Sequence, residues 1–255
     1  YKVFLLASLL ALLTACGKAT IQEDPSAQFE HYSAPQLHFE GQKALQARRY
    51  RRAIEIYEGL ESLYPFGKQA KQGQLNLLYA YYQAGKYAQA VSMADEYIHV
   101  YPRSKHVDYA YYMKGLAHMH SGRSWLQTKL PIDMSQRDMS NAKQAFYDFR
   151  DLLQRFPHSS YGADASQHMI YLRDLFANHE LDIAHYYLER QAYVAAANRA
   201  TDIIHQYQKT PQVKDALVIL VKSKRALKLP KAAQDAYKVL QLNFPHSKEV
   251  KTLAQ

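Results

Sequence analysis

Five sixteen-residue blocks of this 255-residue sequence share one pattern, and that pattern constrains the fold more than any other feature. In each block the fourth residue is alanine, the eleventh is leucine, isoleucine or tyrosine, and the fifteenth is aromatic. Four of the five blocks end in proline, which cannot continue a helix because it lacks a backbone donor and clashes with the preceding turn. The blocks therefore indicate helices that end at equivalent positions. They occupy residues 50–65, 87–102, 142–157, 193–208 and 230–245.

The alanine column has a direct physical meaning, because a methyl side chain lets two packed helices approach closely. In three blocks an aromatic residue follows four positions later, at Tyr57, Phe149 and Tyr237. This pattern resembles the second helix of a tetratricopeptide repeat, which packs against a first helix of the same repeat. The resemblance implies an all-α fold, an α-solenoid of about five tetratricopeptide-like helix pairs. The column itself consists of Ala53, Ala90, Ala145, Ala196 and Ala233.

The spacing of the blocks predicts two insertions. Successive blocks end 37, 55, 51 and 37 residues apart, so the third and fourth repeats are longer than the others. The extra residues of the third repeat fall around 122–139, between its two helices, where we expect a long loop. Those of the fourth repeat lie in a continuous helical pattern from about Gly162 to Glu189. We expect one extended helix there, because fourteen added residues correspond to about four turns and keep the helical phase.

The N-terminus has the features of a secretory signal that ends in a lipidation site. An uncharged, apolar run from Val3 to Leu13 is too short to cross a bilayer, which needs about 20 apolar residues, but has the length of a signal-peptide core. The sequence LTAC then resembles a bacterial lipobox and ends at Cys16, the only cysteine of the chain. An ordinary cleaved signal with a chance cysteine, or an anchor helix, are the alternatives. Gly17 rather than Asp follows Cys16, which favours the outer membrane with the chain facing the periplasm.

These features predict four regions. Residues 1–15 form the signal peptide, and residues 16–33 form a lipidated N-terminus and flexible tether. Residues 34–160 form repeats 1–3, which carry a groove, and residues 161–255 form repeats 4 and 5, the half expected to dock on a partner.

The charge of the chain is compatible with several kinds of partner. A formal net charge of +9 suits an acidic protein, an anionic lipid or a nucleic acid, and does not choose among them. Much of it is concentrated where Arg48, Arg49, Arg51 and Arg52 surround Tyr50. Such a cluster is either a solvated helix face or a contact surface.

The sequence carries no recognisable catalytic or metal-binding motif. It has no glycine-rich phosphate loop, HExxH or GxSxG sequence, and a single cysteine excludes a disulfide within the chain. The histidine pairs His118/His120 and His179/His185 have spacings that place them on different helix faces. We therefore expect a protein that is not an enzyme, with no metal and no cofactor other than covalent lipid on Cys16.

A stripe of tyrosines is the candidate binding surface. Counted from the alanine column, the first helices of repeats 2 and 3 direct Tyr79, Tyr82, Tyr109 and Tyr112 towards the concave face of such an array. Tyrosine offers rigid apolar area together with a hydroxyl that positions hydrogen bonds. We expect a groove for an extended peptide with aromatic side chains. The alternative is that these tyrosines pack inward between repeats.

Several longer segments resemble one family of repeat lipoproteins. The lipobox, the repeats, and the segments YPFGKQAKQGQLNLLYAYY, DYAYYMKGL and HELDIAHYYLERQAYVAAANR are similar to the BamD/ComL-like family of the outer-membrane β-barrel assembly machinery. The resemblance implies a non-catalytic scaffold that docks on the POTRA domains of a BamA-like barrel subunit. It also implies binding of BamC- and BamE-like lipoproteins, and help in receiving and inserting unfolded outer-membrane protein precursors, whose C-terminal signal is aromatic. The alternatives are a competence-linked DNA-handling lipoprotein and a generic periplasmic repeat scaffold for cell-wall proteins.

One arginine departs from the repeat pattern. Arg199 is the seventh residue of its block, where three of the other four blocks have apolar residues. A local ion pair with Asp202, on the same helix face, is one explanation. The match to the AAxNR segment of the BamD/ComL-like family favours another, in which Arg199 binds a carboxylate of the BamA-like partner.

Overall fold

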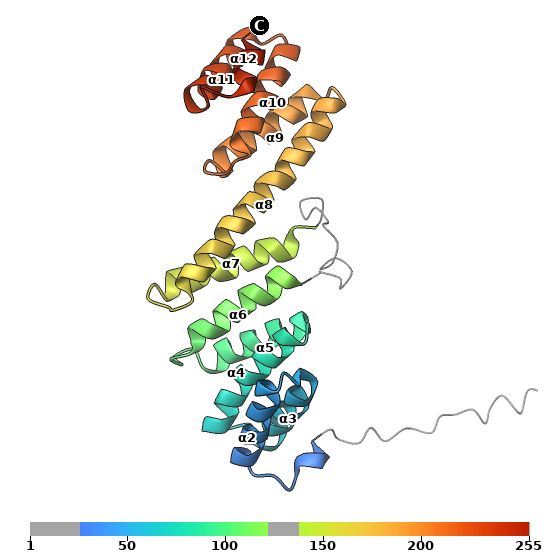
Figure 1. The fold of residues 1–255 in the computed structure, drawn as a ribbon, viewed down its shortest axis with the longest axis vertical. Coiled ribbons are helices and arrows are strands. Elements are labelled where there is room, and N and C mark those ends of the chain that lie inside the picture. The colour runs from blue at the N-terminus through green and yellow to red at the C-terminus, as the bar shows by residue number, and fades with distance from the viewer. Residues whose placement is uncertain (1–25, 122–137, 255) are drawn as a thin grey trace, which may run out of the picture. The chain divides into compact units, whose positions relative to one another are not determined.

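The computed structural model describes residues 26–121 and 138–254, and within them the regular structure is entirely helical (Figure 1). The predicted signal peptide, Cys16 and most of the loop expected at 122–139 lie outside the described residues. By its contacts the chain divides into two compact units, one ending at Gly73 and one beginning at Gln74. Each unit is described by itself below. No helix in the described part is both long and apolar enough to cross a membrane.

The first unit contains the first helix pair. A short 3₁₀ turn, η1 (Ala27–Phe29), precedes α2 (Ala34–Gln46) and α3 (Tyr50–Leu63), and the start of α4 (Lys68–Gln83) completes the unit. The two paired helices approach so closely that only glycine fits at position 41 of α2. A Cβ atom there would lie 2.5 Å from the ring of Tyr57 of α3. Tyr57 is the aromatic residue four positions after Ala53, so the repeat pattern places it against the first helix of its own pair.

The end of the predicted tether is docked on this unit. Phe29 is only 2% exposed and lies against Gly59 of α3. The hydroxyl of Tyr64 donates a hydrogen bond to the carbonyl of Tyr32 at 2.8 Å. Ser33 begins α2 as part of a capping box. The prediction of a flexible tether up to residue 33 is therefore wrong for the residues from Phe29 onward, because the side chain of Phe29 is buried in the first repeat.

The second unit holds the remaining repeats. The pairs α6/α7, α8/α9 and α10/α11 each pack as neighbours, and consecutive helices from α5 to α11 contact one another. The all-α fold built from tetratricopeptide-like helix pairs is thus confirmed. Beyond α4 the helices are α5 (Tyr87–Val100), α6 (Val107–His120), α7 (Ser140–Arg155), α8 (Gly162–Glu189), α9 (Tyr193–Gln206), α10 (Val213–Ala226), α11 (Pro230–Asn243) and α12 (Lys248–Leu253).

The residue positions that repeat from block to block are buried. All five alanines of the column and all five residues of the eleventh column are buried. Gly115 of α6 repeats the arrangement of the first pair, since a Cβ atom there would lie 2.6 Å from the ring of Phe149 of α7. The columns therefore mark the faces on which paired helices pack.

The turn between the two helices of a pair is also repeated. Two residues before the second helix the backbone has a positive φ at Arg48, Gly85, Gln191 and Lys228, with values of 56°, 72°, 60° and 57°. This left-handed conformation ends the first helix, and it usually favours glycine. Only Gly85 among these four positions is glycine, so residue type alone does not predict the turn.

The extended helix predicted for the fourth repeat is confirmed as α8, which runs unbroken over 28 residues. It packs against α7, α9 and α10, so it connects repeats 3, 4 and 5 (Figure 1). The boundary expected between residues 160 and 161 therefore does not separate two compact units. The division falls instead at Gly73, within α4.

The C-terminal helix α12 was not expected. Ser247 caps it by accepting a hydrogen bond from the backbone N–H of Val250. Val250 and Leu253 are buried in one apolar cluster with Leu217 of α10 and Leu240 of α11. Six residues are too few to show a helical period, and such a helix depends on its packing rather than on its own propensity.

Candidate functional site

The structure places two of the predicted groove tyrosines, Tyr109 and Tyr112, against a tyrosine that was not predicted, Tyr161. The ring of Tyr112 stacks on that of Tyr161, which precedes α8, with 4.8 Å between centroids and 16° between planes. The Tyr112 hydroxyl donates a 2.6 Å hydrogen bond to Asp164 of α8. Tyr109 lies 5.5 Å from the same Tyr161 ring. Burial raises the pKa of both Tyr109 and Tyr112, and neighbouring tyrosines or Asp164 add to the shift, so both hydroxyls stay protonated.

The other two groove tyrosines lie on α4. Tyr82 is hydrogen-bonded to Nδ1 of His120 across 2.9 Å, and its ring packs edge-on against Tyr87. Tyr79 is close enough to Tyr109 to contribute to the raised pKa of that residue. All four predicted tyrosines are half-buried. They form a surface, here called the tyrosine surface, that is held in place by contacts within the chain and still exposes part of each ring.

A buried charge cluster lies between the helices of the third repeat. Asp148 of α7 is 4% exposed and contacts Nδ1 of His118 at 2.5 Å and Nζ of Lys114 at 3.5 Å. Lys114 also pairs with Asp95 of α5 at 2.7 Å. Burial alone would lower the pKa of Lys114, but the two carboxylates outweigh it and the pKa is raised. The cluster thus ties α5, α6 and α7 together through charged groups.

Sequence reasoning missed this cluster, although a signal for it was present. His118 occupies a position where the repeat pattern usually has tyrosine, and Asp148 occupies the mostly apolar seventh position of its block. The two departures from the pattern face each other in the structure. Paired departures at facing positions are therefore a useful sign of a polar contact.

Arg199 occupies the same seventh position in α9 and also binds the first helix of its own pair. Its Nη1 atom lies 2.8 Å from Oε2 of Glu180 in α8. Among the described residues this is the ion pair that Arg199 makes, so the alternative explanation, a local pair with Asp202, does not hold. The seventh position faces the partner helix, which directs the side chain across to α8 rather than along α9. The Arg199 side chain remains 41% exposed, and its guanidinium has donors beyond the one bound to Glu180.

A cleft of about 400 Å³ lies beside this ion pair, between α7, α8 and α9. Glu180 lines it together with the cations Lys143 and Arg173. Its aromatic lining residues are Phe146, Tyr147, Phe176 and Tyr207. Burial, followed by the nearby carboxylates Glu180 and Asp202, raises the pKa of Tyr207. A cleft with aromatic walls and two cations can accept an aromatic side chain next to a carboxylate.

Metal chemistry finds no support in the described residues. They contain no group of three or more histidine, cysteine, aspartate or glutamate side chains placed to hold a metal ion. The predicted lipidation site at Cys16 lies outside the described range.

The helix pairs define the class of the protein as a tetratricopeptide-like repeat protein. A family described as YfiO, outer membrane lipoprotein, matches residues 30–240. The outer membrane protein assembly factor BamD of Neisseria meningitidis serogroup B is 38% identical over 247 residues, covering 96% of this chain and 92% of the relative. The BamD of Vibrio cholerae is 36% identical over 208 residues, covering 82% of this chain and 86% of the relative. The chain therefore belongs to the YfiO family of outer membrane lipoproteins, which includes the BamD assembly factors.

Among solved structures, the TPR2AB domain of yeast Sti1 in complex with an HSP90 peptide has a TM-score of 0.47 and 14% identity. It covers 86% of this chain and 81% of that one.

Proposed function

We propose that the chain is a non-catalytic outer membrane protein assembly factor. The observation that carries this proposal is the 38% identity to a BamD assembly factor across nearly the full length of both chains. The proposal places the chain at the outer membrane, anchored by lipid on Cys16 and facing the periplasm. Neither alternative, a DNA-handling lipoprotein or a scaffold for cell-wall proteins, has comparable support from the relatives.

The proposed partners are the other components of an assembly complex. The chain docks on the periplasmic POTRA domains of a BamA-like barrel subunit, and Arg199 contributes a charged contact to that interface. BamC- and BamE-like lipoproteins bind the same scaffold. The part-exposed guanidinium of Arg199 supports this role, because arginine makes forked, charge-assisted hydrogen bonds that suit interfaces.

The proposed substrates are unfolded outer-membrane protein precursors. Their aromatic terminal segments bind the tyrosine surface, where half-exposed rings offer flat apolar contacts and the chain's own hydrogen bonds fix their orientation. Pre-oriented aromatic side chains bind with little loss of conformational entropy.

The tyrosine surface is tested by replacing two of its rings. We expect Tyr79→Ala combined with Tyr112→Ala to reduce crosslinking to an aromatic C-terminal precursor peptide several-fold, because stacking contributes roughly 0.5–1.5 kcal/mol per aromatic pair. Tyr112→Phe is the matched control, since it removes the hydrogen bond to Asp164 but keeps the ring stacked on Tyr161, and its loss of crosslinking should be much smaller than that of the double variant. If the double variant crosslinks normally and only melts at a lower temperature, these tyrosines are structural and the groove is disproved.

A further inference from the structure

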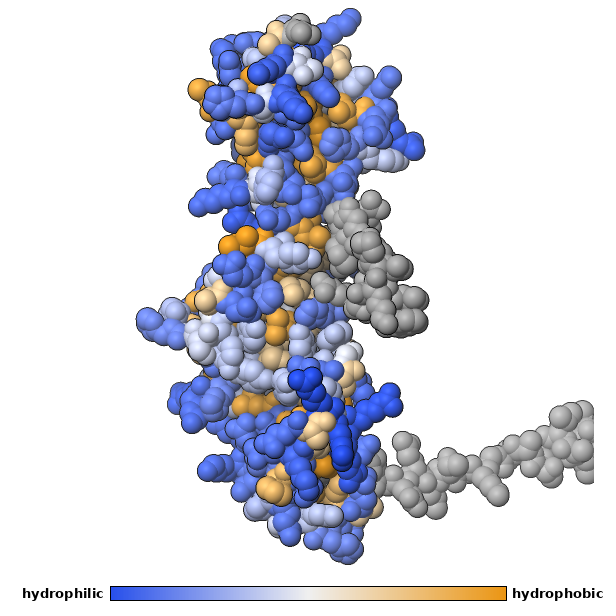
Figure 2. Space-filling view, in the orientation of Figure 1, coloured by the Kyte–Doolittle hydropathy of each residue, from blue (hydrophilic) through white to orange (hydrophobic). Residues whose placement is uncertain are grey.

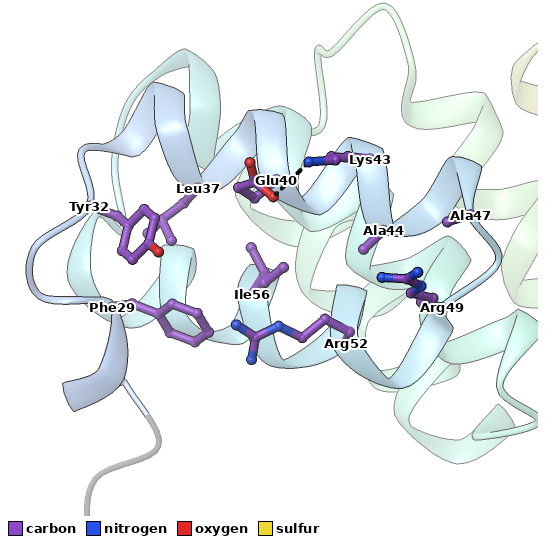
Figure 3. A pocket seen from close by; sticks show the side chains of 10 residues that line it. All are labelled: Phe29, Tyr32, Leu37, Glu40, Lys43, Ala44, Ala47, Arg49, Arg52 and Ile56. Atoms are coloured by element: carbon purple, nitrogen blue, oxygen red, sulfur yellow. Dashed lines mark ion pairs between the residues drawn. The ribbon is translucent and has the colours of Figure 1, made fainter.

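A second cleft lies in the N-terminal unit, away from the surfaces assigned above. It has a volume of about 420 Å³ and lies between η1, α2 and α3 (Figure 3). Its apolar lining includes the buried side chains of Phe29, Leu37 and Ile56. Figure 3 shows Phe29 and Tyr32 at the end of the cleft next to the N-terminal segment, and Arg49 at the opposite end. The cleft thus has an apolar floor, with Arg49 at one end and an aromatic end at the other, where Arg52 lies over the Phe29 ring.

The charges that line this cleft are mostly positive. Lys43, Arg49 and Arg52 line it together with one carboxylate, Glu40. Glu40 pairs with Lys43 at 3.9 Å and Arg52 pairs with Glu55 outside the cleft, so the unmatched positive charge of the lining is that of Arg49. An anionic ligand would complement this lining.

The two arginines differ in what they already bind. Arg52 is engaged, because it pairs with Glu55 at 2.8 Å, donates to Gln28 at 3.1 Å and lies 5.2 Å over the Phe29 ring. The guanidinium of Arg49 makes no ion pair or hydrogen bond with any residue that the structure describes. Arg49 is therefore the cation of the cleft with its donors available.

The position of the cleft along the chain points to the membrane. Cys16 and Ser26, the first described residue, are ten residues apart. A chain of that length cannot span more than about 36 Å even when fully extended. With Cys16 acylated, the cleft is held close to the lipid headgroups, which raises their effective concentration at the site.

We propose that this cleft binds the phosphate of an anionic phospholipid headgroup in the membrane that holds the lipid anchor. Arg49 provides paired N–H donors for the phosphate, which guanidinium groups bind in a forked geometry. Tyr32 at the aromatic end is 42% exposed, and tyrosine is enriched at the interface between headgroups and acyl chains. The inference rests on the lipid anchor of the proposed function. It assigns the N-terminal unit a second membrane contact that orients the body of the chain.

Vesicle binding by the unacylated chain tests this site separately from the anchor. The mature chain, residues 16–255 with Cys16→Ser, is mixed with vesicles of phosphatidylcholine alone or with added phosphatidylglycerol, and the sedimented fraction is measured. We expect binding only to vesicles that contain phosphatidylglycerol. Arg49→Glu should weaken it about 10-fold or more, because the change removes the forked hydrogen bonds to the phosphate and puts a negative charge in their place.

Arg51→Glu is the matched control. It makes the same change of charge at an exposed residue in the first turn of α3, two positions after Arg49, but Arg51 does not line the cleft. We expect it to weaken binding less than about 3-fold, because Arg51 makes no direct contact with a headgroup in the cleft and acts only through the screened surface charge. Unchanged thermal melting of both variants will show that the fold is intact.

Several results would overturn the proposal. Equal losses for the two variants would mean diffuse attraction rather than a site, and equal binding to both kinds of vesicle would exclude headgroup charge. If millimolar inorganic phosphate releases the chain from vesicles that contain phosphatidylglycerol, the cleft is a site for free phosphate. Arg49-dependent binding of an acidic peptide, without vesicle binding, would assign it to a protein partner. The headgroup site and the lipid anchor can fail separately. If the chain binds these vesicles but carries no lipid in cells, the headgroup site stands and the lipid anchor is disproved.

Discussion

The Arg199→Glu variant will fail to copurify with the barrel subunit. Reversing the charge replaces an attractive contact with repulsion at a carboxylate of the partner. Removing one member of a desolvated interfacial charge pair costs about 2–5 kcal/mol, and reversing its sign should cost at least as much. The effect on folding should be small, because the Arg199–Glu180 pair is substantially exposed and such pairs contribute about 0.2–1 kcal/mol. The measurement is recovery of the barrel subunit with the tagged chain, alongside its melting temperature.

The ion pair with Glu180 makes it possible to separate an interface role from a structural one. Combining Arg199→Glu with Glu180→Arg restores an ion pair between α8 and α9 but leaves a negative charge at position 199. If Arg199 contacts the partner, this double variant stays unable to copurify it, and Glu180→Ala alone binds normally. Recovery of binding in the double variant would show that Arg199 serves only to hold α9 against α8.

Cys16→Ser will release the chain from the outer membrane in cells that lack the barrel partner. The serine hydroxyl is not a substrate for thioether-linked lipid attachment, and stable anchoring depends on buried acyl chains that contribute about 0.8 kcal/mol per CH₂. The measurement is membrane fractionation together with the mass of the N-terminal peptide, which should lose its lipid.

A change at the neighbouring residue is the control for lipidation. Gly17→Asp keeps Cys16 and its lipid but changes the residue that favours the outer membrane, so this variant should remain in a membrane fraction. The lipid-anchor proposal would be refuted by unlipidated Cys16→Ser chain that still fractionates with the outer membrane when the partner is absent.

The repeat architecture could be predicted because its signals are local and repeated. The alanine at Ala145 and the aromatic residue at Phe149 are four positions apart, so they share one helix face whatever the rest of the chain does. The length of α8 could be predicted because the helical period continues through the inserted residues without a break. Such patterns depend on neighbours within one helix or one helix pair.

The features that sequence reasoning missed depend on contacts between distant segments. The docking of Phe29 on Gly59 joins residues 30 positions apart, and no periodic pattern announces it. For Arg199 the sequence suggested only Asp202 as an intrachain partner, because Asp202 is near in sequence, whereas Glu180 is near only after α8 and α9 pair. The same holds for the N-terminal cleft, whose aromatic end comes from a segment expected to be a free tether.

The central claim is that this chain works as part of an outer-membrane protein assembly complex, and isolation of the intact lipoprotein tests it most directly. The tagged, lipidated chain is extracted from outer membranes in mild detergent, and the proteins bound to it are identified and quantified. The proposed function predicts a large β-barrel subunit with periplasmic domains, in an amount comparable to the chain itself and lost in Arg199→Glu. A chain recovered without any barrel protein, bound instead to DNA or to cell-wall proteins, would contradict it.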